Sequence, residues 1–162
     1  MSMFVDKASQ ASVRAAGRVE RLKTMTDRLM SEIVRNQRPL TLREDATIAE
    51  ACRQMHERRA GAVMVTNADG NLLGIFTGRD AVRTLAQGCA ADGRLDAAMT
   101  RSPDTMPPGR PAIDALRLMQ EGGFRHLPVV DGGQVVGVVS WGDFRTSEHD
   151  RLDTEVNLWE RI

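Results

Sequence analysis

Apolar residues recur along this chain in two patterns, one helical and one extended, and the two patterns alternate in the same order twice. Two segments carry apolar side chains three or four positions apart, which is the spacing of an amphipathic helix. These side chains are Ile48, Ala51, Cys52 and Met55 in the first segment, and Ala112, Ala115, Leu116 and Met119 in the second. Each segment is followed by two short apolar runs separated by a turn. The turns are rich in Gly, Asn and Asp, which tolerate positive φ, and they predict two β-hairpins.

Each hairpin belongs to a larger predicted unit. A Pro-led extended piece precedes each helix, and a second helix is predicted to begin near Asp80 and near Asp143. Thr47 is the predicted N-cap of the first helix, because Glu50 follows it at capping-box spacing. The order of elements is therefore β-α-β-β-α in both halves of the chain.

The two units also match residue by residue. From Pro39 to Val65, seven residues have an identical partner 64 positions later. After a one-residue deletion at the turn the offset becomes 63, and Asp80 then corresponds to Asp143 and Thr77 to Ser140. A unit of this size has one apolar sheet face that it cannot bury alone. We therefore expect an α/β (α+β) fold in which two repeats pack as a pseudo-two-fold pair.

Amphipathic helices are predicted on both sides of the repeats. Their apolar positions are Val19, Leu22, Met25, Leu29 and Ile33 before the repeats, and Leu152, Val156, Trp159 and Ile162 after them. We interpret Trp159 in the second set as a contact to a partner chain. The predicted division is an N-terminal helical extension (1–32), a first repeat (33–84), a linker (85–97), a second repeat (98–145) and a C-terminal amphipathic helix (146–162).

Composition narrows the class of partner. The chain has 22 Lys+Arg and 22 Asp+Glu, and this balance removes a general attraction to nucleic acid or to an anionic membrane. Residues 1–38 hold eight Lys/Arg and four Asp/Glu, but their apolar stripe suits packing equally well, so nucleic-acid binding is disfavoured. Two cysteines in Ala- and Leu-rich surroundings favour reduced thiols. No apolar run approaches the ~20 residues of a membrane span, and no signal segment is evident, so a cytoplasmic location is expected.

The repeated motifs resemble those of a known family. The run from Arg125 through Leu127-Pro128-Val129-Val130, followed by Gly137-Val138-Val139-Ser140-x-x-Asp143, is similar to the cystathionine-β-synthase (CBS) domain. The first copy carries a more divergent version that ends in Thr77-x-x-Asp80. Two such copies, over about residues 30–145, resemble a Bateman module and stand-alone bacterial CBS-pair proteins. The resemblance implies two clefts for adenine-type ligands such as AMP, ADP, ATP, S-adenosylmethionine or NAD, and assembly into a homodimer.

Within the implied clefts, the Thr77-x-x-Asp80 and Ser140-x-x-Asp143 motifs are the strongest candidates for ligand contact. Each follows a buried strand at the expected start of a helix, where a carboxylate can accept hydrogen bonds from two ribose hydroxyls. Backbone N–H groups at a helix start also favour an anion. A carboxylate stabilises the first turn of a helix in any case, so both interpretations stay open.

Cationic residues suggest that the two clefts differ. Arg125 and His126 match positions where nucleotide-binding relatives hold phosphate, although the imidazole suits packing as well. The first copy has Gly61 and Ala62 there, so we expect the second copy to supply the phosphate-binding side. Arg79 and Arg83 either add cations to a cleft or are solvated.

An adenine base needs a flat apolar slot with backbone polar groups. The candidates for this slot are Thr41, Leu42, Ala62, Val63, Thr105, Met106, Pro128 and Val138, all of which also suit an ordinary core. The complete set of predicted ligand-binding residues is Thr41, Ala62, Val63, Thr77, Arg79, Asp80, Thr105, Arg125, His126, Pro128, Val138, Ser140 and Asp143.

The sequence carries no pattern for catalysis. The three His and two Cys lack metal-ligand spacing, and neither a G-x-S-x-G elbow nor a phosphate-binding P-loop is present. We therefore predict a non-enzymatic regulatory module with no required cofactor, which senses an adenine nucleotide and transmits its occupancy to an unidentified partner. The alternative is a ligand-free dimerisation scaffold.

Overall fold

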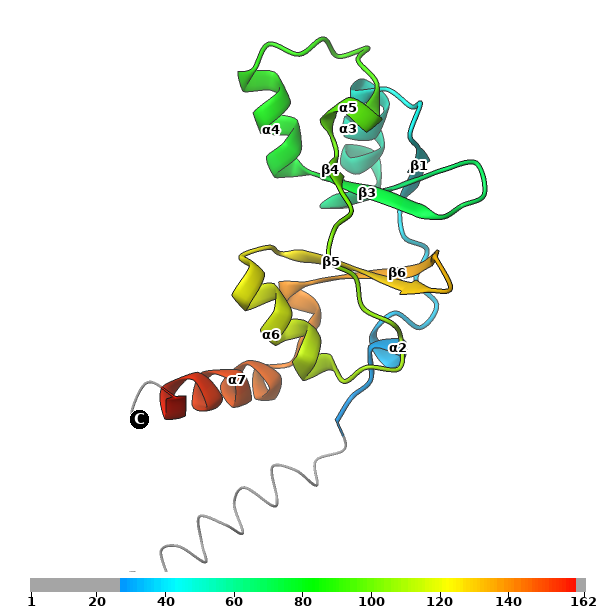
Figure 1. Cartoon of the computed structure of the whole chain (residues 1–162). Helices are drawn as coiled ribbons and strands as arrows, with labels where there is room; N and C mark the ends of the chain where they lie inside the picture. The colour runs from blue at the N-terminus through cyan, green and yellow to red at the C-terminus, as the bar shows by residue number, and fades with distance from the viewer. Residues whose placement is uncertain (1–26, 160–162) are drawn as a thin grey trace, which may run out of the picture.

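The chain forms two stacked lobes whose sheets face each other and whose helices lie on the outer sides (Figure 1). The computed structural model describes residues 27–159. The first lobe contains β1 (Thr41–Arg43), α3 (Ile48–Arg58), β2 (Ala62–Thr66), β3 (Leu72–Thr77), α4 (Gly78–Ala86), α5 (Leu95–Ala98) and β4 (Thr100–Arg101). The second contains α2 (Met30–Ile33), α6 (Ala112–Gly122), β5 (His126–Asp131), β6 (Gln134–Ser140), the 3-10 turn η1 (Trp141–Asp143) and α7 (Thr146–Trp159). The predicted α/β class is confirmed.

The two sheets differ in size although the two repeats share a pattern. In the first lobe β1 pairs parallel to β2, and β2-β3-β4 continue antiparallel. In the second lobe only β5 and β6 form a sheet, and the expected first strand is reduced to one bridge between Met106 and Val129. Apolar side chains from the facing strands close the seam, among them Ala62, Met64 and Ile75.

Local sequence explains where the principal helices begin. The Thr47 hydroxyl caps α3 as predicted, accepting from the Glu50 N–H at 3.1 Å, whereas the Glu50 carboxylate bonds Arg53 and Gln54. The helix expected near Asp143 is only the three-residue η1. Phe144 then takes an extended backbone and enters the core of the second lobe, so α7 begins two residues later, at Thr146.

Each lobe is completed by a segment from the start of the other repeat. β4 lies at the start of the second repeat, yet it pairs with β3 of the first lobe through Gly74 and Ile75. Met30 and Val34 lie at the start of the first repeat, yet they are buried in the core of the second lobe. Close approach requires glycine at the crossing, because a Cβ on Gly74 would lie 2.7 Å from the Thr100 carbonyl oxygen.

The flanking segments meet on the second lobe. Leu152 of α7 is 3% exposed in the same core as Met30. Arg28 donates to the Glu148 carboxylate and to the Asp143 carbonyl oxygen. The predicted N-terminal helix lies largely outside the described residues, as does Ile162. Within residues 27–159, no helix is long and apolar enough to cross a membrane.

Candidate functional site

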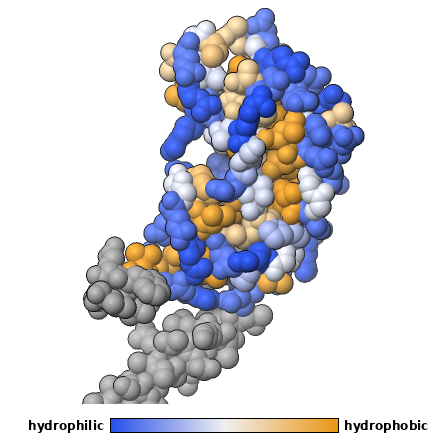
Figure 2. Space-filling view, viewed as in Figure 1, coloured by the Kyte–Doolittle hydropathy of each residue, from blue (hydrophilic) through white to orange (hydrophobic). Residues whose placement is uncertain are grey.

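Two cavities open at the seam between the lobes. Cavity 1 has a volume of about 640 Å³ and is built around the Thr77-x-x-Asp80 motif. Cavity 2 has a volume of about 470 Å³ and is built around the Ser140-x-x-Asp143 motif. Both volumes fall within the range of about 300–1,000 Å³ that small-molecule sites occupy. Figure 2 shows hydrophilic residues around the hollow between the lobes, with an apolar band continuing from one lobe to the other.

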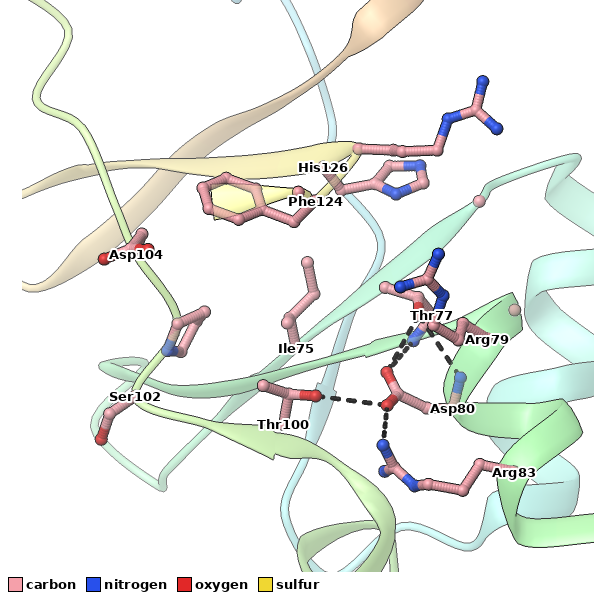
Figure 3. A pocket seen from close by; sticks show the side chains of 15 residues that line it. Ile75, Thr77, Arg79, Asp80, Arg83, Thr100, Ser102, Asp104, Phe124 and His126 are labelled. Atoms are coloured by element: carbon pink, nitrogen blue, oxygen red, sulfur yellow. Dashed lines mark hydrogen bonds and ion pairs between the residues drawn. The ribbon is translucent and has the colours of Figure 1, made fainter. Parts of the chain in front are cut away.

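Cavity 1 combines residues of both repeats. Thr77, Arg79 and Asp80 come from the end of β3 and the start of α4, whereas Arg125 and His126 come from the second repeat, across the seam. Figure 3 shows Asp80 and Arg79 on one side of the cavity and His126 on the opposite side. Arg125 and His126 of the second copy line the same cavity as the motif of the first, so the repeats build this cavity jointly.

The Asp80 carboxylate is already fully engaged. It is 3% exposed, and its Oδ2 accepts from the Thr77 N–H at 2.8 Å and from the Thr77 hydroxyl at 3.0 Å. Its Oδ1 accepts from the Thr100 hydroxyl at 3.2 Å and pairs with Arg83 at 2.8 Å (Figure 3). Asp80 therefore completes the capping box of α4, whose N-cap is Thr77, and ties β4 to that helix. A ribose would have to displace Thr100 or Arg83 to reach it.

Asp143 forms the same kind of capping box with Ser140, but one oxygen of its carboxylate accepts no hydrogen bond from residues 27–159. Its Oδ2 accepts from the Ser140 N–H at 2.6 Å and from the Ser140 hydroxyl at 2.8 Å. The carboxylate is exposed, and its Oδ1 accepts no hydrogen bond from any residue in the described range 27–159. The lone pairs of Oδ1 point to Asp143 as the better-prepared acceptor for a ligand hydroxyl.

His126 lines both cavities. Its imidazole covers Gly61, where an added Cβ would lie 2.6 Å from the His126 Nε2 atom. Burial lowers the pKa of His126 from its ordinary value and the Arg125 charge lowers it further, while Asp143 acts in the opposite direction. This direction favours the neutral imidazole, which has a single N–H donor and packs against Gly61 where both cavities reach it.

The apolar residues predicted for the base slot divide into two groups. Ala62 and Val138 line cavity 2. Thr41, Val63, Thr105 and Pro128 line neither cavity. Val63 and Pro128 are buried in the lobes, and both threonines are exposed.

Sequence reasoning missed several cavity residues. Arg38, Arg58 and Arg59 line cavity 2, so the first copy does supply cations to a cleft, from the end of α3 rather than from the start of β2. Phe124 places an aromatic ring in cavity 1, and Asp104 adds a carboxylate there. The 64-residue offset could have identified Arg59 and Phe124, because they lie at the same helix-to-strand junction in the two repeats. Over residues 27–159, no three His, Cys, Asp or Glu side chains form a metal-binding group.

A repeated pair of α/β lobes with two corresponding cavities at its seam defines a tandem-domain, two-cleft protein. The sequence model of the CBS domain matches residues 30–87 and, a second time, residues 94–150. The chain therefore belongs to the CBS-domain family and carries two CBS domains in tandem.

Relatives and solved structures agree with this assignment. The CBS domain-containing protein CBSCBSPB2 of Arabidopsis thaliana is 40% identical over 108 residues, which are 65% of this chain and 20% of that protein. The chain thus spans about a fifth of the length of that relative. The CBS domain protein PAE2072 of Pyrobaculum aerophilum, solved in complex with AMP, has a TM-score of 0.71 and 30% identity, covering 78% of this chain and 99% of that one.

A second solved structure is that of the CBS domain pair of protein MJ0100, in complex with 5-methylthioadenosine and S-adenosyl-L-methionine. It has a TM-score of 0.67 and 26% identity to this chain, and it covers 79% of this chain and 97% of that one.

Proposed function

We propose that this chain is a regulatory module that binds an adenine-type nucleotide in the clefts between its CBS domains and transmits the occupancy to a partner protein. The free Oδ1 of Asp143, at the edge of a 470 Å³ cavity lined by arginines, is the observation that carries the proposal. The same cavity is thus lined by a carboxylate for the ribose and by arginines for phosphate. Similar CBS pairs solved with AMP or with S-adenosyl-L-methionine support the ligand class.

Transmission requires that the ligand distinguish two states. Both cavities are built from both repeats, so a ligand contacts the two lobes at once and favours the relative orientation that it fits best. The equilibrium shifts only by the difference in affinity for the two orientations.

The ligand prediction is tested by thermal-shift and calorimetric titration with AMP, ADP, ATP, NADH and S-adenosylmethionine. At a ligand concentration 100-fold above Kd, a bound ligand stabilises the fold by about 2.7 kcal/mol, and we expect at least one of the five to do so. Asp143→Ala is expected to remove most of that response because it deletes the ribose acceptor. Asp150→Ala, an exposed aspartate on α7, is the control and keeps the response. A wild-type protein that responds to none of the five contradicts the proposal.

A ligand-free scaffold is the second candidate, and an unpartnered apolar surface on α4 favours it. Val82 and Leu85 lie three residues apart on this helix, and they are 68% and 80% exposed. Exposed apolar side chains of this size are typical of a contact surface. A homodimer in which α4 meets a second copy would bury them.

Leu85→Glu is expected to shift the protein from dimer to monomer, because the substitution places a charge in the apolar contact. Sedimentation velocity at several protein concentrations measures the change. Gln120→Glu adds the same charge on the exposed side of α6 and serves as the control. Unchanged sedimentation of Leu85→Glu would rule out α4 as the contact. A dimer that forms in a protein with no nucleotide response would favour the scaffold.

A further inference from the structure

Arg59 has a left-handed backbone conformation, which is unfavourable for any residue that carries a Cβ atom. It caps the C-terminus of α3 with φ 51° and ψ 39°, in the left-handed region, and its N–H donates to the carbonyl oxygens of Met55 and His56. The corresponding cap of α6 has the same hydrogen bonds but is Gly123, with φ 65° and ψ 26°. Glycine is the usual residue at this position because it has no Cβ to clash with the following carbonyl oxygen. One repeat thus has the relaxed cap and the other holds an arginine at the strained one.

The side chain of Arg59 lines cavity 2, where positive charge is in excess. Arg38, Arg58 and Arg59 line this cavity, and the aspartate Asp143 is its lone carboxylate among residues 27–159. None of the three arginines has a described carboxylate within ion-pairing distance. The Arg58 guanidinium donates to the Arg38 carbonyl oxygen at 2.9 Å, which holds the two segments of this wall together.

Cavity 1 is closer to charge balance. It also has three arginines, but two aspartates line it, Asp80 and Asp104. Arg83 is committed to Asp80 at 2.8 Å and to the Ala98 carbonyl oxygen at 2.7 Å. Fewer N–H groups remain for a ligand phosphate in cavity 1 than in cavity 2. The two clefts therefore suit ligands of different charge.

We propose that cavity 2 is the site for an adenine nucleotide with two or three phosphates, and that Arg59 is the residue that selects for the added phosphate. This assignment rests on the proposed function and names the ligand class of one of its two clefts. A disfavoured backbone conformation that is retained is a reason to look for a function of the side chain, and Arg59 is one of the residues that line cavity 2. Its planar N–H fork binds phosphate oxygens in pairs, so it adds affinity for each further phosphate within reach.

The test replaces Arg59 with the residue found in the other repeat. Arg59→Gly is expected to leave the Tm of the ligand-free protein unchanged or to raise it by up to about 3 °C, because strain is relieved. It is expected to weaken ADP binding at one of two calorimetric sites about tenfold, the usual effect of one charge-assisted hydrogen bond. AMP binding should change less than about threefold. Arg59→Lys keeps the charge without the fork and should fall between wild type and Arg59→Gly.

Two further measurements separate the cavities and the ligand parts. Arg79→Ala, in cavity 1, is expected to leave ADP binding at the affected site unchanged. Inorganic tripolyphosphate probes the phosphate contacts without an adenosine, and it should raise the Tm of wild type but not of Arg59→Gly.

Each outcome decides between the two proposals. If Arg59→Gly keeps both the ADP-to-AMP ratio and the tripolyphosphate response of wild type, the Arg59 assignment is overturned and the proposed function stands. A fall in the Tm of ligand-free Arg59→Gly also overturns it, since the cap would then not be strained. If wild type binds neither AMP nor ADP but tripolyphosphate protects it through Arg59, nucleotide sensing fails and the phosphate site stands.

Discussion

Asp80→Ala is expected to lower the free energy of unfolding by about 3 kcal/mol, the largest effect that we predict for a cavity residue. The substitution removes a buried carboxylate, so the half-buried Thr77 N–H and the hydroxyl of the exposed Thr100 lose their acceptor and Arg83 loses its ion pair. A hydrogen bond to a charged group contributes about 1.5–3 kcal/mol, and the loss of several weak ones here together gives the expected value. The ion pair adds little, because the Arg83 side chain is 44% exposed and solvent screens it.

Asp143→Ala is the matched control, because the same motif stands there without the buried contacts. Asp143 is exposed, and among residues 27–159 its carboxylate accepts only from Ser140, so its removal breaks the capping box but leaves the N-cap Ser140 in place and should cost about 1 kcal/mol. Urea denaturation of both variants measures the difference. Equal losses for the two would show that the Thr100 and Arg83 contacts contribute nothing to stability. The comparison also explains why Asp143, rather than Asp80, is the residue for binding tests: its loss leaves the fold intact.

Gly74→Ala is expected to destabilise the protein by about 2 kcal/mol through overpacking at the crossing between the repeats. The added methyl would lie 2.5 Å from the Met99 Sδ atom and 2.7 Å from the Thr100 carbonyl oxygen. The Met99 side chain can move, but the Thr100 carbonyl belongs to the backbone of β4, so the strand itself must shift. Because Thr100 also donates to Asp80, the wall of cavity 1 moves with it.

Gly109→Ala provides the control, since no atom lies within 4 Å of the added methyl and the backbone φ is not positive. This variant should stay within about 0.5 kcal/mol of wild type. Thermal denaturation of the two variants gives the comparison. If Gly74→Ala is as stable as the control, β4 can shift to make room for the added methyl without loss of stability, and the prediction is wrong.

The repeat made most of the fold predictable. Apolar spacing located both hairpins and the helices α3 and α6, because each of these elements buries one face and its apolar residues therefore repeat with the period of a helix or a strand. The strand β4 has only two residues, too few to show a periodic pattern. It forms because Gly74 lets the chain approach β3 closely, and this depends on a contact between distant segments rather than on local propensity.

The site was predictable in its motifs and not in their surroundings. Asp80 and Asp143 are indistinguishable in sequence, yet one is buried and the other exposed. The reason lies in their neighbours: Thr100 and Arg83 bond Asp80, whereas the residues at the matching offsets in the other repeat are Asn36 and Thr146.

The arginines of cavity 2 escaped prediction for a different reason. Arg59 reaches the cavity through a left-handed helix cap, and the other repeat has Gly123 at that position. A comparison of the two copies by identity therefore passes over it.

The exchange of segments between the lobes means that neither CBS domain is complete by itself. Cut near Gly88, the chain would yield an amino-terminal fragment that lacks the outer strand supplied by Thr100 and Arg101, and a carboxy-terminal fragment whose core lacks Met30 and Val34. The amino-terminal fragment would also lose Leu95, Ala98 and Met99 from its core, so each fragment would expose apolar surface that the other covers in the whole chain. We therefore expect the two CBS domains to fold and unfold together as one unit, and we expect a single CBS domain cut from this chain not to fold stably.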